Sequence, residues 1–200
     1  MVDENLQRAK EIFFQYACNH FYLNREVEAV EYKRFDISKE QEKIWYREYV
    51  SYWTGKLSLD DLVALNHLRD AYAEEALPEL LRLSTLGDSF AKLSFANTIW
   101  DIAYGGMMSP FMREKSRRKA VFIWQALLNN PIELTDSHSQ LVTEDNILNY
   151  ARNKLEESKK RNGIYFLFIS IFMGIISVAT MFIDLVDKTK RLGKGKRQKS

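Results

Sequence analysis

Cysteine is almost absent from this sequence, with Cys18 as its single representative in 200 residues. One thiol cannot form an internal disulfide, and it excludes every zinc motif that is built from several cysteines. The three histidines, at positions 20, 67 and 138, form no His-Glu-x-x-His pattern and are best explained as ordinary surface or core polar residues. We therefore expect no metal site and a chain that resides in a reducing compartment.

The signatures of common catalytic chemistries are missing as well. The sequence contains no Gly-x-Ser-x-Gly, no P-loop and no Gly-x-Gly-x-x-Gly. Gly105-Gly106 is explained more simply as a helix stop than as a phosphate cradle. The acidic pairs at 60–61 and 74–75 fall in the first turns of predicted helices, where the helix dipole accounts for them. The sequence predicts no catalytic residues, no cofactor and no enzyme.

Acidic residues outnumber basic ones along most of the chain. Residues 1–184 contain 22 basic and 26 acidic side chains, a net charge of −4, whereas residues 185–200 contain seven basic residues against Asp187. An acidic body does not favour nucleic-acid binding. The N-terminal stretch, Met1-Val-Asp-Glu-Asn, has neither the basic nor the apolar region of a signal peptide, so we expect the body to stay in the compartment where it is made.

A long apolar run occurs once, at Gly163–Ile183, where 21 consecutive residues carry no charge. At 1.5 Å per residue such a helix is about 31 Å long, which matches a hydrocarbon core of about 30 Å. A core helix without a polar face would need protein on every side, and a body of about 160 residues can scarcely supply it. The sequence therefore predicts a soluble helical domain over 1–158, a transmembrane helix over 163–184 that contacts the lipid bilayer, and a basic tail over 185–200.

Orientation is predicted from two opposing observations. Both flanks of the span are basic, and the charge rule alone favours a cytosolic tail. A cytosolic tail would, however, require an acidic folded body without a signal peptide to cross the membrane, whereas the opposite orientation requires only the short tail to cross. We expect a single-pass, tail-anchored protein with its body in the cytosol. The membrane would be the inner membrane in a bacterium, or a mitochondrial or peroxisomal membrane in a eukaryotic cell.

Small residues line one face of the predicted span. Ser170, Gly174 and Ser177 follow one another at spacings of four and three, so they share a helix face. Such a row permits close contact between two helices and makes the span a candidate for a homo-oligomer through the membrane. Glycine and serine are also common in membrane helices in general, which leaves a plain anchor as the alternative.

The soluble body is predicted to be all-α. It contains only three prolines and a single weak alternating stretch, at residues 26–32. Helical periodicity places helices at about 5–23, 38–55, 59–73, 75–86, 89–104, 115–129 and 143–162. Ser38 and Gln41 resemble a capping box, Gly55 a helix stop, and Ser58 the cap of the next helix. Short helices joined by short turns predict stacked helical hairpins, followed by the single C-terminal transmembrane helix.

The stretch Glu75–Asn130 resembles Sel1-like repeats, which are relatives of the tetratricopeptide repeat. The matching positions are Ala76, Leu80, Leu81, Ala91, Ala96, Tyr104-Gly105-Gly106, Lys119-Ala120, Trp124 and Ala126. The match covers about one and a half units, and it lacks the glycine-rich pair expected after Gly106 and a tandem copy upstream. The resemblance implies paired helices that bind other proteins. An unrelated helical hairpin with similar small-residue packing is the alternative.

These observations predict a non-enzymatic, membrane-anchored adaptor that receives a protein partner in a groove between stacked helices. Tyr46 and Arg47 lie off the apolar face of an aromatic-rich helix and are candidate partner anchors. The alternative is a bacterial conflict protein, which would be either an immunity factor that sequesters a toxin or a defence effector that oligomerises through its span. The sequence leaves the identity of the partner open.

Overall fold

The computed structural model describes residues 2–161. The predicted transmembrane helix at 163–184, with Ser170, Gly174 and Ser177, and the basic tail at 185–200 lie outside these residues. None of the helices within 2–161 combines the length and the hydropathy that crossing a bilayer requires. The chain divides into two compact units, Met1–Leu155 and Glu156–Ser200. The first of these is the helical body described below.

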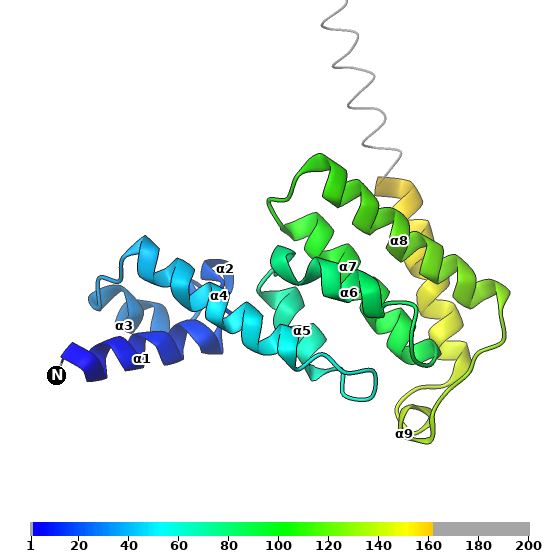
Figure 1. Cartoon of the computed structure of the whole chain (residues 1–200), viewed down its shortest axis with the longest axis horizontal. Helices are drawn as coiled ribbons and strands as arrows, with labels where there is room; N and C mark the ends of the chain where they lie inside the picture. Colours follow the sequence, from blue (N-terminus) through cyan, green and yellow to red (C-terminus); the bar gives the residue numbers. More distant parts are fainter. Residues whose placement is uncertain (1, 162–200) are drawn as a thin grey trace, which may run out of the picture. The chain divides into compact units, whose positions relative to one another are not determined.

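The described part of the chain is all-helical and contains no strand, which confirms the predicted all-α class. Figure 1 shows the order of its elements along the chain. They are α1 (Val2–Gln15), α2 (His20–Leu23), α3 (Glu28–Arg34), α4 (Lys39–Gly55), α5 (Val63–Asp70), the 3-10 helix η1 (Glu74–Ala76), α6 (Leu77–Leu83), α7 (Ser89–Gly105), α8 (Pro110–Asn129) and α9 (Asp136–Ser139). A last helix covers 144–161, and the weakly alternating stretch at 26–32 lies mostly within α3.

The helix expected at 5–23 is broken in the middle. Ala17 and Cys18 have φ angles of 52° and 54°, and the Cys18 backbone N–H donates to the Phe13 carbonyl at 2.8 Å. Such a left-handed step ends a helix. Asn19 then begins α2, because its side chain accepts from the Phe21 backbone N–H at 3.0 Å. Hydrophobic periodicity continues through the break and therefore does not reveal it.

Two serines begin the next elements in different ways. Ser38 accepts from the Gln41 backbone N–H at 3.1 Å and caps α4, as predicted. Ser58 was expected to cap a helix over 59–73, and this prediction is wrong. Its hydroxyl accepts from the Asp60 and Asp61 backbone N–H groups and holds a turn, so that α5 begins only at Val63.

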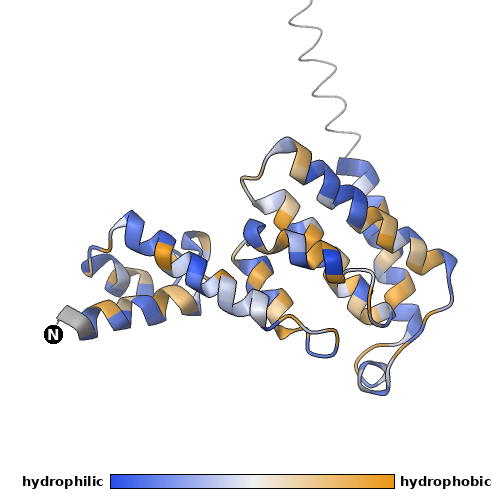
Figure 2. Cartoon of the chain, in the orientation of Figure 1, coloured by the Kyte–Doolittle hydropathy of each residue, from blue (hydrophilic) through white to orange (hydrophobic). Residues whose placement is uncertain are grey.

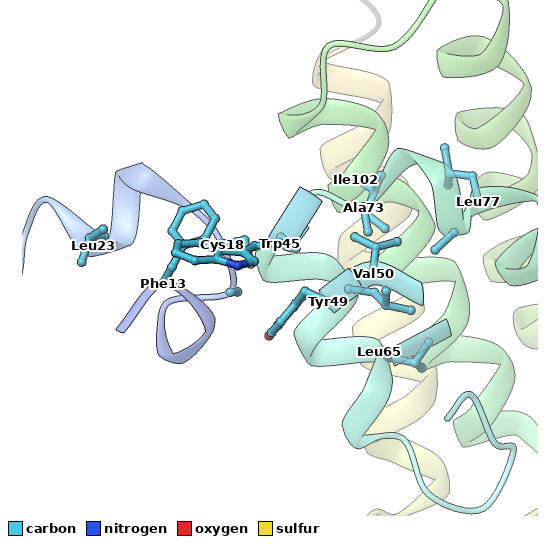
Figure 3. Packing of buried hydrophobic residues seen from close by; sticks show 14 of the residues in the cluster. Phe13, Cys18, Leu23, Trp45, Tyr49, Val50, Leu65, Ala73, Leu77 and Ile102 are labelled. Carbon is cyan, nitrogen blue, oxygen red and sulfur yellow. The ribbon is translucent and has the colours of Figure 1, made fainter. Parts of the chain in front are cut away.

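Two clusters of buried residues form the core of the body, and α7 contributes to both of them. The first joins α1–α6 to α7 and includes Phe13, Trp45, Tyr49, Leu65 and Ile102 (Figure 3). The second joins α7 to α8 and to residues 144–155, and includes Leu93, Trp100, Trp124, Ile147 and Leu155. Because α7 is covered from two sides, ten of its 17 residues are buried, and apolar residues occupy both of its faces (Figure 2).

Candidate partner-binding groove

A hollow of about 320 Å³ opens where the end of α6, the first turns of α7 and the C-terminal half of α8 meet. The loop that follows α8 closes one of its sides. The residues that line the hollow are Ser84, Thr85, Ser89, Lys92, Phe122, Ile123, Ala126, Leu127, Asn130, Pro131 and Glu133. It lies largely within the stretch that resembles Sel1-like repeats.

The floor of the groove is apolar and comes from α8. Phe122, Ile123, Ala126 and Leu127 follow a helical i, i+1, i+4, i+5 pattern, which places them on one side of the helix. Ile123 and Leu127 are buried in the second core cluster, so the floor is held by the body. Phe122 is 60% exposed, and its ring is available to a partner. Ala126 is small and keeps the hollow open between its larger neighbours.

The rim is polar and carries both signs of charge. Lys92 stands on α7 and Glu133 on the loop after α8, while Thr85 and Asn130 supply uncharged polar groups. An apolar floor with a polar rim is the usual construction of a groove that receives a short segment of another protein. The two charges favour oppositely charged groups on a partner.

The wall formed by residues 130–135 is fixed to the start of α7. The Ser89 backbone N–H donates to the Glu133 carbonyl at 2.8 Å, and the Glu133 backbone N–H donates to the Ser89 hydroxyl at 3.0 Å. Asp88 accepts from the Ala91 backbone N–H at 2.9 Å, which caps α7, and from the Thr135 backbone N–H at 2.9 Å. The same carboxylate therefore begins the helix and holds the loop.

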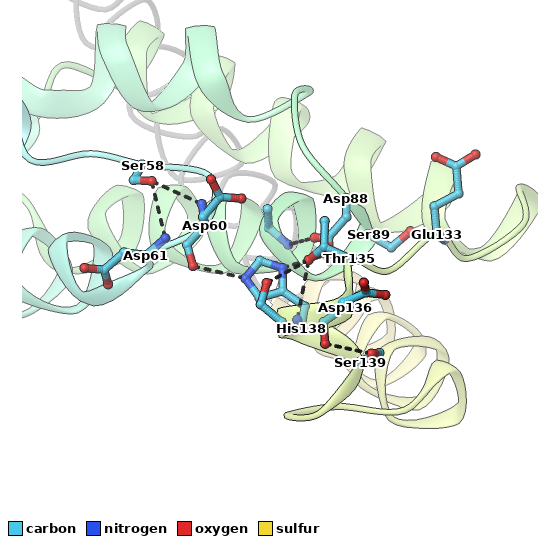
Figure 4. Close-up of polar contacts among 12 residues, drawn as sticks. Ser58, Asp60, Asp61, Asp88, Ser89, Glu133, Thr135, Asp136, His138 and Ser139 are labelled. Atoms are coloured by element: carbon cyan, nitrogen blue, oxygen red, sulfur yellow. Dashed lines mark hydrogen bonds and ion pairs between the residues drawn. The ribbon is translucent and has the colours of Figure 1, made fainter.

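His138 links this wall to a third segment, as Figure 4 shows. Its ring is 2% exposed, with Nδ1 at 2.8 Å from Asp88 Oδ2 and Nε2 at 3.3 Å from the Asp60 carbonyl oxygen. Because the carboxylate can only accept, Nδ1 is the donor in the contact with Asp88. The His138 ring also makes an edge-on contact with the Phe90 ring, and the two ring centroids are 5.1 Å apart.

The electrostatics of Asp88 follow from these contacts. Burial raises the pKa of this carboxyl, but hydrogen bonds from Ala91, Thr135 and His138 outweigh burial and lower the pKa below its ordinary value. Asp88 is therefore an ionised acceptor that fixes the groove wall at neutral pH. We call Asp88, Thr135 and His138 the wall clamp.

The predicted partner anchors Tyr46 and Arg47 lie elsewhere. Arg47 is exposed at a second hollow of about 270 Å³, which Val50, Ser51, Thr54 and Glu75 also line. Tyr46 is partly buried against the first core cluster, and its hydroxyl donates to Glu75 Oε2 at 3.1 Å. Burial raises the pKa of the Tyr46 hydroxyl. Arg47 is thus open to a partner, whereas Tyr46 already serves the fold.

The sequence predicted a groove between stacked helices, and of the residues that line this hollow it named only Ala126, as a repeat position. The usable signal was Phe122, a large apolar residue directly before the buried pair Ile123 and Trp124, because one helix cannot bury three consecutive positions against one neighbour. The wall clamp offered no such signal, because Asp88 and His138 are 50 positions apart.

Within residues 2–161, no three or more His, Cys, Asp or Glu side chains come together in a way that could hold a metal ion. Cys18 is buried, and burial raises the pKa of its thiol, so it is a poor nucleophile and a poor metal ligand. His20 contacts Glu42 at 3.1 Å, and His67 stacks on Trp53 with centroids 3.6 Å apart. Each histidine is occupied by a structural contact.

The groove has to be interpreted from its own chemistry. The Sel1-like resemblance remains a prediction that rests on the residues between Glu75 and Asn130. No protein-family model, no curated protein and no solved structure matches the chain.

Proposed function

We propose that this protein is a membrane-anchored helical adaptor that binds a segment of another protein in the groove on α7 and α8. The observation that carries the proposal is the groove itself, which combines an apolar floor, an exposed Phe122 ring and a rim with one basic and one acidic side chain. The wall clamp supports it, because a groove with fixed walls loses little conformational entropy when a partner binds.

The groove selects the chemistry of its partner. A volume of about 320 Å³ suits one or two apolar side chains, which would pack against Phe122 and over Ala126. Lys92 favours an acidic group and Glu133 favours a basic group near that apolar residue. The expected ligand is a short protein segment in which an apolar residue has charged neighbours of both signs.

The membrane supplies the second half of the function. The apolar run at 163–183 inserts the chain, and the body then presents its groove on the cytosolic side of the membrane. Tethering raises the local concentration of the groove for a partner that also resides at the membrane, so a modest affinity is sufficient.

The groove is tested by photocrosslinking in the native membrane. A photoreactive phenylalanine analogue replaces Phe122 in the full-length chain, and a matched protein carries it at Phe111, which is 76% exposed on the same helix but does not line the groove. We expect a discrete protein adduct from position 122 and none from position 111. Ala126→Arg should abolish the adduct, because the long side chain fills the hollow. Equal protein adducts from both positions, or an adduct that survives Ala126→Arg, would exclude the groove.

The anchor is tested separately by fractionation. We expect the full-length chain to resist carbonate extraction and a chain that ends after Leu155, the last residue of the first unit, to be recovered in the soluble fraction. Recovery of the full-length chain in the soluble fraction would contradict the anchor.

A further inference from the structure

The turn between α7 and α8 exposes apolar side chains beside basic ones. Met107, in the turn after the buried helix α7, is 99% exposed, and Phe111, in the first turn of α8, is 76% exposed. Residues 107–119 contain five basic residues and one acidic residue, a net charge of +4 within a body that is acidic as a whole. In Figure 2 this turn is largely apolar, and hydrophilic residues follow it along the first half of α8.

The exposed residues gather on one side of α8. Phe111, Lys115 and Arg118 are spaced i, i+4, i+7 and are all exposed, so they share the outward face of the helix. The acidic exception, Glu114, lies beside them and pairs with Arg118 at 2.8 Å. We call Met107, Phe111, Lys115 and Arg118 the turn surface.

The fold holds this turn in a fixed shape without using its exposed side chains. Met108 is buried in the first core cluster. The Arg113 guanidinium donates to the Gly106 carbonyl at 3.2 Å, and the Ser109 hydroxyl caps α8 by accepting from the Met112 backbone N–H at 3.3 Å. Core packing therefore does not explain why Met107 and Phe111 are apolar.

The chain also leaves the first unit on this side. Residues 144–155 run back along α8 toward its N-terminal half, with Ile147, Ala151 and Leu155 in the core cluster that they share with it (Figure 1). Eight peptide steps separate Leu155 from Gly163, the start of the predicted span. Even a fully extended chain covers only about 29 Å over that distance. The predicted span therefore follows the first unit after only a short stretch of sequence.

We propose that the turn surface lies against an anionic membrane leaflet, with Met107 and Phe111 in the headgroup region and Lys115 and Arg118 on lipid phosphates. Exposed aromatic and apolar residues flanked by lysine and arginine are the pattern of segments that bind the surface of anionic bilayers. Two apolar side chains in basic surroundings are too small an area for a stable protein interface. This inference rests on the anchor of the proposed function, and it implies that the body is held in one orientation at the membrane.

The test uses the full-length chain in lipid nanodiscs made either of phosphatidylglycerol and phosphatidylcholine or of phosphatidylcholine alone. A photoreactive phenylalanine analogue is placed at position 111 or, as the matched control, at Phe122, which is 11 residues further along the same helix and 60% exposed. We expect several-fold more lipid adducts from position 111 than from position 122 in the anionic discs. The yield should fall several-fold in phosphatidylcholine alone and in a Lys115→Glu, Arg118→Glu variant.

Three outcomes would overturn the inference. A chain that resists carbonate extraction but labels lipid equally from both positions, or from neither, leaves the anchor intact and removes the turn surface. A covalent product of twice the chain's mass from position 111 assigns the surface to a second copy. A chain that carbonate releases contradicts the anchor itself, and with it this inference. Unchanged thermal unfolding of the charge-reversal variant shows that the fold is retained, as expected for exposed positions.

Discussion

Gly105 ends α7 directly beside the ring of Tyr72, and a β-carbon at this position would overlap that ring. Gly55 ends α4 in the same way, but nothing lies within 4 Å of the place that its β-carbon would take. The two glycines have the same helical position in different surroundings. The sequence predicted that both glycines end helices. Only the structure shows that Gly105 is also packed against Tyr72.

Gly105→Ala should therefore destabilise the body, because Tyr72 has to move. We expect the free energy of unfolding to fall by about 1–3 kcal/mol, the usual cost of overpacking. Gly55→Ala is the matched control and should leave stability unchanged or raise it slightly, since alanine favours the helix. Denaturant unfolding of both variants measures the difference, and equal stabilities would show that Tyr72 adapts freely.

Asp88 gives the body a pH dependence whose sign follows from its contacts. Its pKa in the folded body is lower than in the unfolded chain, so the ionised form contributes stability above the ordinary carboxyl pKa of about 3.9. That contribution is lost as the pH falls through the folded pKa. Asp88→Asn should remove it, so the stability difference between the two proteins should be largest at neutral pH and shrink in acid.

Unfolding free energies measured from pH 7 down to pH 3 test this expectation. Asp36→Asn is the control, because Asp36 is exposed and has a φ of 47°, which asparagine accepts readily. Asp36→Asn should change the free energy of unfolding very little at each pH. If the difference in unfolding free energy between the native protein and Asp88→Asn stays constant across this pH range, the charge of the carboxylate adds no stability and Asp88 acts only through the geometry of the wall clamp.

At the scale of helices and turns, local signals were readable and long-range ones were not. The cap at Ser38 was predicted, and so was the break between the helices expected at 75–86 and 89–104, where Gly87 has a φ of 75°; both depend on neighbouring residues. The break at Ala17 and Cys18 depends on non-glycine residues in a glycine-like conformation, which nothing in the local pattern announces. The wall clamp pairs residues 50 positions apart, and the groove depends on it. A groove between helices could therefore be predicted, but the residues that line it could not.

The pairing of α7 with α8 depends on small residues. Ala120 is fully buried in the second core cluster, so Ala120→Leu should overpack it and cost about 1–3 kcal/mol. Gln125→Leu adds the same side chain at an exposed position of α8 and should change stability by less than about 0.5 kcal/mol. Thermal unfolding compares the two variants. An unaffected Ala120→Leu body would argue against the close helix approach that the repeat resemblance implies.

For the whole molecule, the distribution of charge and hydropathy carries most of the functional interpretation. The acidic body, the single apolar run and the basic tail were readable from composition along the chain, because insertion depends on a sum over about 20 residues rather than on particular contacts. The turn surface was not recognised in this way, because its four residues are not consecutive in the sequence. Exposure, which only the fold provides, distinguishes Met107 from its neighbour Met108.

A substitution among the small residues of the predicted span distinguishes the adaptor hypothesis from the hypothesis of a membrane-acting effector. Ser170, Gly174 and Ser177 share one helix face, and a bulky side chain in the middle of that row would hold two helices apart. Gly174→Ile should lower crosslinking between full-length chains in a bilayer and leave insertion intact, because it adds apolar surface. Ala179→Ile adds a similar side chain on a different face and should change neither property.

If the protein is an adaptor, the protein adduct from position 122 should persist in Gly174→Ile, whereas the activity of an effector should be abolished. Unchanged crosslinking in Gly174→Ile would show that the row is compositional and that the span is a plain anchor.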